Sequence, residues 1–236
     1  MTEAVILAGG LGTRLRSAVS DVPKPMAPIN GKPFLDLLLY DLSQKGIKRV
    51  VLSLGYMANI IQDYFGKKKY DIEIIYNIEE SPLGTGGAIY SSLKLCNDEG
   101  ILVLNGDSYI GFDLSALKNQ WSKYKKPVIV TRLENPSMRY GNILLEKDKI
   151  RSFSNQITNT KTNKVIINAG VYILPKNILN HYSDGDVFSF ELDYLPCAVK
   201  NEQFYAIKSD DYFIDIGIPS DFKKAQTELA KNIYND

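Results

Sequence analysis

Three glycines and three basic side chains follow an apolar run at residues 3–8, and together they could bind a polyanion: Gly9, Gly10, Gly12, Arg14, Arg16 and Lys24. Glycines let backbone N–H groups approach a phosphate or a base closely. Arginine offers a planar fork to phosphate oxygens, and lysine acts as a point charge that can lie at a reacting phosphoryl group. So many cations in one segment indicate a ligand richer in charge than a dinucleotide, such as a nucleoside triphosphate. The alternative is a flexible surface loop with solvated cations.

Two familiar glycine motifs do not fit this segment. The phosphate loop of nucleotide hydrolases needs Gly-Lys-Ser/Thr, but Gly-Lys occurs only at 31–32 and 66–67, before Pro33 and Lys68. The dinucleotide motif G-x-G-x-x-G, started at Gly10, requires a glycine where the chain has Leu15.

Composition excludes several other classes of protein. The 28 Lys and Arg residues against 27 Asp and Glu residues create no field that would indicate nucleic acid or a membrane as the partner. No apolar run approaches a membrane span and no secretion signal is visible, so we expect a cytoplasmic location. Cys96, Cys197 and the sole histidine, His181, are too sparse to indicate a disulfide framework, a zinc site or a nucleophilic triad.

Strands alternate with helices over the first 133 residues. Apolar runs predict strands at 3–8, 48–55, 71–77, 100–107 and 126–133. Helical spacing predicts one helix at 34–45 and a second that ends near Gly66. It predicts a third that follows the glycine loop at 81–87 and a fourth at 114–125. This order is typical of a parallel sheet with helices on both faces.

Shorter strands dominate the rest of the chain. We expect them at 142–147, 149–154, 165–174, 203–208 and 212–216, with helices at 186–199 and 219–234. The polar loop 155–164 is expected to cover a site. The sequence thus predicts one α/β domain over 1–236, a Rossmann-like three-layer sandwich with a mixed, mostly parallel central sheet.

The glycine segment, "LAGGLGTRLR…KPM", resembles the signature of the sugar-1-phosphate nucleotidyltransferases, which make nucleotide-diphosphate sugars. Further landmarks follow in family order: "PLGTGGA" (82–88), "NGD" (105–107), "RYGNI" (139–143), "INAGVYIL" (167–174) and "FIDIGIPSDFKKAQ" (213–226). The resemblance covers essentially the whole chain. It implies a nucleotide-binding half at about 1–133 and a sugar-phosphate half at about 134–236.

The resemblance implies attack of a sugar-1-phosphate oxygen on the α-phosphorus of a nucleoside triphosphate, which expels pyrophosphate. The nucleophile is already anionic, since the second pKa of a phosphate monoester is about 6, so no general base is needed. Arg14 is expected to hold the β- and γ-phosphates and Lys24 the α-phosphate. Asp107 and Asp215 are expected to bind Mg²⁺, which prefers carboxylate oxygens. The alternatives are a turn residue for Asp107 and a helix cap for Asp215.

The nucleotide is expected to contact Leu7, Gly9, Gly10, Gly12, Thr13, Gly84 and Thr85, by resemblance to the family. Glu79 and Glu80 precede "SPLGTGG", where the family reads the nucleobase. A carboxylate can accept hydrogen bonds from both N1–H and the N2 amine of guanine, so Glu79 favours GTP. The alternative is that both glutamates are solvated loop charges.

Gly141, Asn168 and Gly170 are the expected contacts of the sugar phosphate. After the strand at 150–153 the family normally has Glu-Lys, but this chain has Asn155 and Gln156 there. Neutral amides can bind hydroxyls but cannot neutralise a phosphate. Lys161, Lys164 or Arg139 could replace the missing cation, and we hypothesise that Lys164 does so when the 155–164 loop closes.

Within the family, "PLGTGGAI", "INAGVYIL" and "FSFELDYLP" (188–196) resemble guanylyltransferases that use D-glycero-α-D-manno-heptose 1-phosphate. Mannose-1-phosphate guanylyltransferases and uridylyl- or thymidylyltransferases are the alternatives. A non-catalytic nucleotide-binding subunit stays open because the family lysine is missing.

A glycosyltransferase would need an Asp-x-Asp motif, which occurs only as "DGD" (184–186), where Asp186 is expected to cap a helix instead. The aromatic residues are expected in the core and on a surface that could form a homodimer.

Overall fold

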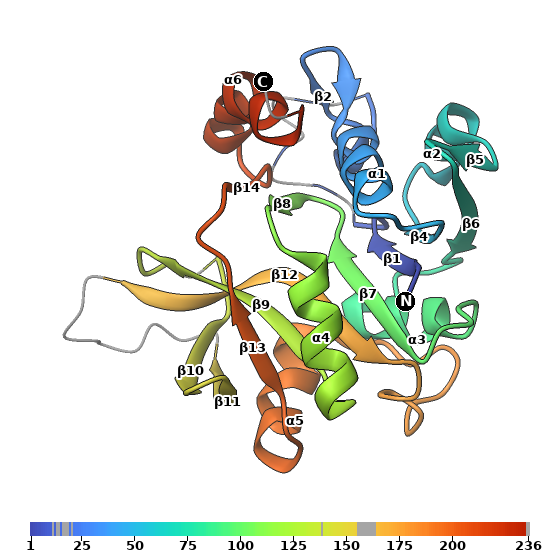
Figure 1. Cartoon of the computed structure of the whole chain (residues 1–236). Coiled ribbons are helices and arrows are strands. Elements are labelled where there is room, and N and C mark those ends of the chain that lie inside the picture. The colour runs from blue at the N-terminus through green and yellow to red at the C-terminus, as the bar shows by residue number, and fades with distance from the viewer. Residues whose placement is uncertain are drawn as a thin grey trace.

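The computed structural model describes residues 1–10, 12, 15, 19, 21–137, 139–154 and 164–234 (Figure 1). The strands are β1 (Glu3–Leu7), β2 (Pro28–Ile29), β3 (Lys32–Pro33), β4 (Arg49–Leu54), β5 (Lys68–Lys69), β6 (Ile72–Ile78), β7 (Gly100–Asn105), β8 (Ser108–Ile110), β9 (Val128–Glu134), β10 (Asn142–Glu146), β11 (Lys149–Ser154), β12 (Val165–Pro175), β13 (Tyr205–Lys208) and β14 (Phe213–Asp215). The helices are η1 (Lys24–Met26), α1 (Phe34–Gln44), α2 (Ala58–Phe65), α3 (Gly84–Leu93), α4 (Leu114–Tyr124), η2 (Phe190–Tyr194), α5 (Leu195–Asn201) and α6 (Pro219–Tyr234).

The central sheet has ten strands in the order β10-β11-β13-β9-β12-β7-β1-β4-β6-β5. β1, β4, β6 and β7 pair in parallel, and β13 is parallel to β9. β12 runs antiparallel to both β7 and β9, and β5 and β11 also oppose their neighbours. Seven of the ten strands therefore share one direction, and the predicted mixed sheet is confirmed.

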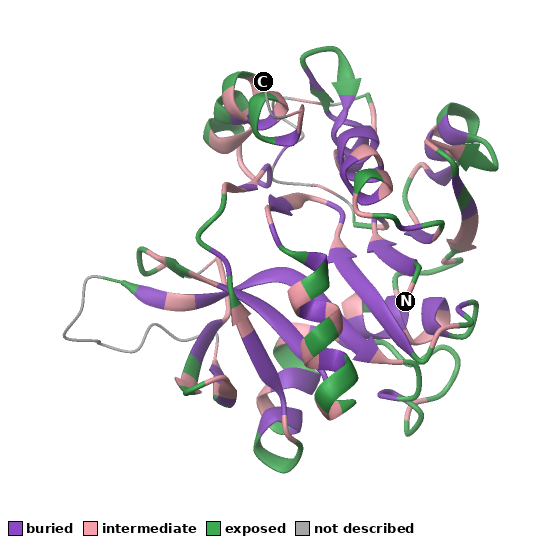
Figure 2. Cartoon of the chain, in the orientation of Figure 1, coloured by how far each residue is buried: buried purple, intermediate pink, exposed green. Residues whose placement is uncertain are grey.

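Alternating residues of the strands face two separate cores, which gives the three layers. Ala4 and Ile6 pack in one core with α1, α2, α4 and α6, while Val5 packs in the other with α3 and α5. This period of two is expected for a strand buried on both faces. Figure 2 shows the strands as mostly buried and the helices as exposed on their outer sides.

In the described part of the chain, two short ladders lie outside the central sheet; of their strands only β14 was predicted, at 212–216. β2 pairs with β3, and β8 pairs antiparallel with β14. In Figure 1 β8 and β14 lie side by side between the central sheet and α6. The β8–β14 ladder brings the last part of the chain to the carboxyl end of β7.

The helix predicted at 186–199 is corrected by the structure. It begins as a turn of π-helix at Phe190, continues as α5 and ends at Asn201. Ser189 is its N-cap, because its side chain accepts a hydrogen bond from the Leu192 amide. The prediction that Asp186 caps this helix was wrong, since its carboxylate accepts from the Ser183 amide and closes a preceding turn.

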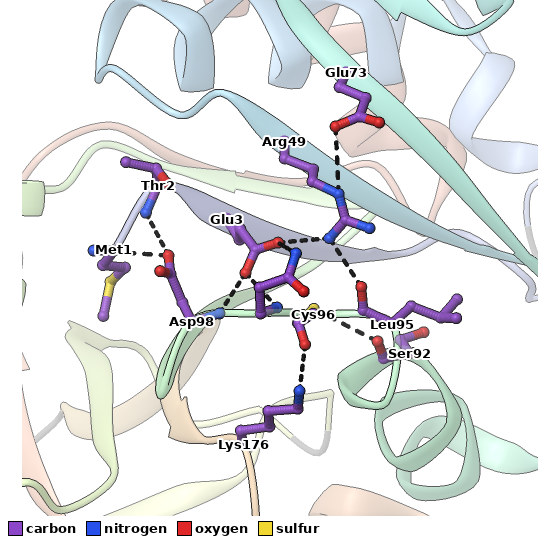
Figure 3. A network of polar contacts seen from close by, with 11 residues as sticks. Met1, Thr2, Glu3, Arg49, Glu73, Ser92, Leu95, Cys96, Asp98 and Lys176 are labelled. Atoms are coloured by element: carbon purple, nitrogen blue, oxygen red, sulfur yellow. Dashed lines mark hydrogen bonds and ion pairs between the residues drawn. The ribbon is translucent and has the colours of Figure 1, made fainter.

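A polar network fixes the amino-terminal ends of β1 and β4 (Figure 3). The buried Glu3 carboxylate accepts hydrogen bonds from the Asn97 and Asp98 amides, each at 2.6 Å, and from Arg49 at 2.5 Å. Burial alone would raise the pKa of Glu3, but these donors hold it below its ordinary value.

Among the residues that the structure describes, no helix is both long and apolar enough for a bilayer span.

Candidate active site

The carboxyl ends of four parallel strands form one wall of a cavity. Leu7 is in register with Ser53 of β4 and with Asn105 of β7, and Glu79 directly follows β6. The cavity has a volume of about 270 Å³. Its lining comprises Leu7, Ala8, Gly9, Gly10, Lys24, Pro25, Ser53, Glu79, Pro82, Gly84, Thr85, Ala88, Asn105 and Asp107. Open α/β sheets bind ligands at this edge.

The glycine loop packs closely against its surroundings. A Cβ atom on Gly9 would lie 3.1 Å from the Gly55 amide nitrogen, and one on Gly12 would lie 2.9 Å from Cβ of Lys24. Gly10 has open space at the same position, so a ligand can approach its backbone. Thr13 and Arg14 lie outside the described residues.

Lys24 lies between the two carboxylates that were predicted to bind metal. Its Nζ atom is 2.5 Å from Oδ2 of Asp107 and 3.9 Å from Oδ1 of Asp215. The Lys24 side chain is 10% exposed, whereas that of Asp107 is 41% exposed. A cation is thus held where both carboxylates meet, at the wall of the cavity.

The β8–β14 ladder explains how residues so distant in the chain come together. Asp215 pairs with Ser108, the residue after Asp107. The Ile216 amide donates to the Asp107 carbonyl at 3.0 Å, and the Gly217 amide donates to Oδ1 of Asp215 at 2.7 Å. Backbone pairing therefore fixes both carboxylates.

Arg139 holds the other oxygen of Asp215. Its guanidinium donates to Oδ2 of Asp215 at 2.7 Å and to Oδ2 of Asp221 at 2.6 Å. Burial alone would lower the pKa of Arg139, but the two carboxylates keep it above its ordinary value. Among the described side chains at this point, three carboxylates face two cations, which leaves one negative charge for a further cation.

The site suits a divalent metal ion. Its two carboxylates offer hard oxygen donors, and the Lys24 ammonium already lies within ion-pair distance of both. Within the described ranges no group of three or more His, Cys, Asp or Glu side chains is placed to hold a metal ion. Mg²⁺ commonly binds one or two carboxylates and takes its other ligands from phosphate and water, which matches this donor set.

Glu79 is oriented by two donors at the cavity wall. Its Oε2 atom accepts from the Leu83 amide at 3.0 Å and its Oε1 atom from the Ser53 hydroxyl at 3.3 Å. Each carboxylate oxygen has a second lone pair, so Glu79 can still accept from a ligand.

Gly84 and Thr85 line the same cavity, but their side-chain positions face the protein. A Cβ atom on Gly84 would lie 2.4 Å from the Phe188 carbonyl oxygen. The Thr85 hydroxyl is bonded to Glu191 and to the Phe190 amide. Their exposure to a ligand is therefore through backbone and methyl groups.

The predicted sugar-side residues form a second group beside the cavity. The Asn168 amide donates to the Gly141 carbonyl at 2.9 Å and the Gly170 amide donates to Oδ1 of Asn168 at 3.1 Å. A Cβ atom on Gly170 would lie 2.8 Å from Nδ2 of Asn105, which links this group to the cavity lining. Lys164 is exposed just before β12, and Asn155, Gln156 and Lys161 lie outside the described residues.

Four residues of this region received no role from the sequence. Ser53 and Asn105 line the cavity, Glu191 contacts Thr85, and Asp221 contacts Arg139. A polar residue at the end of an apolar strand is the signal that could have identified Ser53 and Asn105. Glu191 and Asp221 carry no such signal, because their partners lie far away in the chain.

The Asp-Gly-Asp motif is engaged elsewhere. Asp184 pairs with Lys94 at 2.5 Å, and Asp186 closes its own turn. Neither residue lines the cavity that holds Lys24 and Asp107.

Comparison with known proteins yields a family and several full-length relatives. The family described as nucleotidyl transferase matches residues 3–232. The chain is 42% identical over 232 residues to the D-glycero-alpha-D-manno-heptose 1-phosphate guanylyltransferase of Aneurinibacillus thermoaerophilus, covering 98% of this chain and 100% of that protein. It is 43% identical over 221 residues to the enzyme of the same name from Campylobacter jejuni, covering 93% and 96% of the two chains.

A solved structure agrees with the described fold. HddC from Yersinia pseudotuberculosis, crystallised in complex with GMP-PN, superposes with a TM-score of 0.81 and is 40% identical. The match covers 97% of this chain and 100% of that chain.

Proposed function

The chain belongs to the nucleotidyl transferase family, and on that premise we propose that it is a sugar-1-phosphate guanylyltransferase. It condenses GTP with D-glycero-α-D-manno-heptose 1-phosphate and releases a GDP-sugar and pyrophosphate. The names of two relatives that are 42% and 43% identical support this choice of base and sugar.

One observation carries the proposal. Lys24 contacts Asp107 and lies near Asp215 at the wall of a cavity that is also lined by the glycine loop and Glu79. Phosphoryl transfer depends on positioning and charge neutralisation more than on proton transfer. A site with one lysine, two carboxylates and exposed backbone N–H groups meets these needs without a general base.

The residues act on the phosphates through their charges. Asp107 and Asp215 would hold Mg²⁺, which when bound neutralises phosphate charge. Lys24 exchanges its contact with Asp107 for oxygens of the α-phosphate and of the departing pyrophosphate. Arg14 holds the β- and γ-phosphates, and Arg139 keeps Asp215 oriented by its bond to Oδ2.

Nucleobase choice rests on Glu79 and the backbone around it. Its carboxylate is oriented by Ser53 and by the Leu83 amide, and it faces the cavity. Guanine offers N1–H and an N2 amine to such an acceptor, whereas the pyrimidines of UTP and dTTP place carbonyl oxygens on both sides of N3–H. Residues 1–133 would thus serve the nucleotide and residues 134–236 the sugar phosphate.

The test is a substrate panel with pyrophosphate release as the readout. GTP, UTP, dTTP and CTP are each offered with D-glycero-α-D-manno-heptose 1-phosphate, mannose 1-phosphate and glucose 1-phosphate. We expect the highest kcat/KM with GTP and the heptose 1-phosphate. Preference for a pyrimidine nucleotide would overturn the assignment of guanine as the base. Preference for another sugar 1-phosphate would overturn the assignment of the heptose as the sugar substrate.

The same panel separates the rival functions. A glycosyltransferase would release no pyrophosphate from any pair in the panel, and would instead release a nucleoside diphosphate once a nucleotide sugar and an acceptor are supplied. GTP binding without turnover of any pair would indicate a non-catalytic nucleotide-binding subunit.

A further inference from the structure

A chain of side-chain hydrogen bonds connects the start of α3 to Asn168, and Glu191 is at its centre. Oε2 of Glu191 accepts from the Thr85 hydroxyl at 2.7 Å. Oε1 accepts from the Tyr172 hydroxyl at 3.3 Å. Tyr172 in turn accepts from Nδ2 of Asn168 at 2.6 Å. One carboxylate therefore joins the nucleotide side of the cavity to the sugar side.

Fixed donors set the direction of each bond in this chain. The Phe190 amide donates to Oγ1 of Thr85 at 2.8 Å, so the Thr85 proton points to Glu191. An ionised carboxylate can only accept, so the Tyr172 proton also points to Glu191. The oxygen of Tyr172 is then left to accept, and the amide group of Asn168 that faces it must be the NH₂.

Burial makes this arrangement persistent. Tyr172 is 0% exposed and Asn168 is 8% exposed, so water does not compete for their bonds. Burial first, and the nearby Glu191 second, raise the pKa of Tyr172 well above its ordinary value. The phenol stays protonated and remains the donor to Glu191.

Asn168 is the point where the chain of bonds reaches the expected sugar site. Its Oδ1 accepts from the Gly170 amide, and its backbone amide donates to the Gly141 carbonyl. Each side-chain atom uses one bond in these contacts, which leaves one N–H and one acceptor position of Asn168 for a ligand. A sugar hydroxyl can satisfy both groups, because it donates and accepts.

The backbone around Glu191 is held firmly against α3. Glu191 lies in the π-helical turn Phe190–Tyr194, a conformation that is often found at functional sites. The Gly86 amide donates to the Phe188 carbonyl at 2.9 Å, and the Phe188 amide donates to the Leu83 carbonyl at 3.1 Å. The carboxylate is thus placed by two segments that are distant in the chain.

We propose that Glu191 is a positioning residue for the sugar 1-phosphate. By accepting a hydrogen bond from the Tyr172 hydroxyl, it fixes the amide orientation in which Asn168 meets the sugar hydroxyls. This inference rests on the proposed function, since it assigns Asn168 to the sugar substrate.

The test replaces Glu191 by glutamine, which has nearly the same shape but can also donate. Glu191→Gln lets the Tyr172 proton turn toward Asn168 and weakens the preferred amide orientation. We expect the KM for the heptose 1-phosphate to rise about five- to tenfold, as for the loss of one net hydrogen bond. The kcat and the KM for GTP should stay within about twofold, because Glu191 reaches the nucleotide side only through the Thr85 hydroxyl, for which glutamine keeps an acceptor oxygen. Tyr172→Phe should raise the same KM, and the double variant should add little to either single change.

Asp193→Asn is the matched control, because this exposed carboxylate lies on the same turn and bonds only to the Ser189 amide among the described contacts. It should leave the KM for the sugar phosphate unchanged. Equal effects of Glu191→Gln on both KM values, or a fall in thermal stability with unchanged KM values, would overturn the proposal.

A measurement without turnover separates this inference from the proposed function. The side-chain NH₂ signals of Asn168 in a ¹⁵N correlation spectrum should shift in Glu191→Gln and in Tyr172→Phe but not in Asp193→Asn. Unchanged Asn168 signals would refute the role of Glu191 even if the enzyme is active. An inactive wild-type protein would refute the guanylyltransferase assignment instead.

Discussion

Gly84→Ala should destabilise the protein because two separate costs coincide at this position. Gly84 has φ of +70°, and a Cβ atom there would lie 2.4 Å from the Phe188 carbonyl oxygen. A left-handed conformation costs an L-residue about 1–2 kcal/mol, and overpacking against backbone costs about 1–3 kcal/mol. The lower conformational entropy of the unfolded alanine variant offsets these costs by about 0.4–1 kcal/mol. We expect a net loss of about 2–4 kcal/mol in the free energy of unfolding.

Two other glycines separate these costs. Gly185 has φ of +88° but no atom within 4 Å of its Cβ position, so Gly185→Ala carries the conformational cost alone, about 1 kcal/mol or less. Gly87 has no such φ, but its Cβ position lies 2.5 Å from the Asp186 carbonyl oxygen. Gly87→Ala therefore carries the contact alone, offset by the higher helix propensity of alanine, for a net cost of about 1–2 kcal/mol.

The assay is urea unfolding followed by circular dichroism, with isothermal titration of GTP on the folded variants. Gly84→Ala should lose the most stability of the three variants and also bind GTP more weakly, because it moves the start of α3 at the cavity. Equal stability of Gly84→Ala and Gly185→Ala would refute the close packing of α3 on the 186–188 segment.

Two further predictions concern charge. Glu3→Gln should cost about 1–3 kcal/mol at pH 7, because Glu3 accepts several buried hydrogen bonds. Folding lowers the pKa of Glu3, so its contribution to stability is complete above pH 4.5 and is lost as the pH falls through the pKa of the folded state. The difference in the free energy of unfolding between wild type and Glu3→Gln should therefore close below pH 4.5. A difference that stays constant with pH in urea unfolding would contradict this. If Lys164 replaces the family lysine that neutralises the sugar phosphate, Lys164→Ala should raise the KM for the sugar 1-phosphate and leave the KM for GTP unchanged. Unchanged steady-state constants for both substrates would reject that role.

Regular elements could be predicted well because their signals are local. The apolar runs that became β1, β4, β6 and β7 end within two residues of the predicted boundaries. The helices α1 and α2 end just before Gly46 and Gly66, as expected. These patterns depend on burial of adjacent residues, which a single sequence displays directly.

Non-local pairing could not be derived from the same patterns. β8 and β14 have three residues each, too few for a clear period of two, yet their ladder is what places Asp215 beside Asp107. The resemblance to a family, not the residue pattern, supplied that pair. The helix start at 186 was wrong because an aspartate in a Ser-Asp-Gly-Asp turn has the same composition as a cap.

Contacts between charged side chains were even harder to predict from the sequence. Arg139 was considered only as a substitute cation, but its guanidinium joins Asp215 to Asp221 on α6. Glu191 lies in the segment 188–196, which resembles the family, but the sequence indicates no role for its carboxylate. Its partners, Thr85 and Tyr172, lie far from it in the sequence.

The central claim is that Asp107 and Asp215 together bind the cation that the reaction needs. The most direct measurement is pyrophosphate release from GTP and the heptose 1-phosphate by Asp107→Asn and Asp215→Asn, with Mn²⁺ binding followed by calorimetry in the same variants. We predict that both variants stay folded, bind Mn²⁺ more weakly in the presence of GTP, and lose about 10²–10³-fold in kcat, while Asp193→Asn behaves as wild type. Turnover close to wild type in either Asp107→Asn or Asp215→Asn would contradict the account.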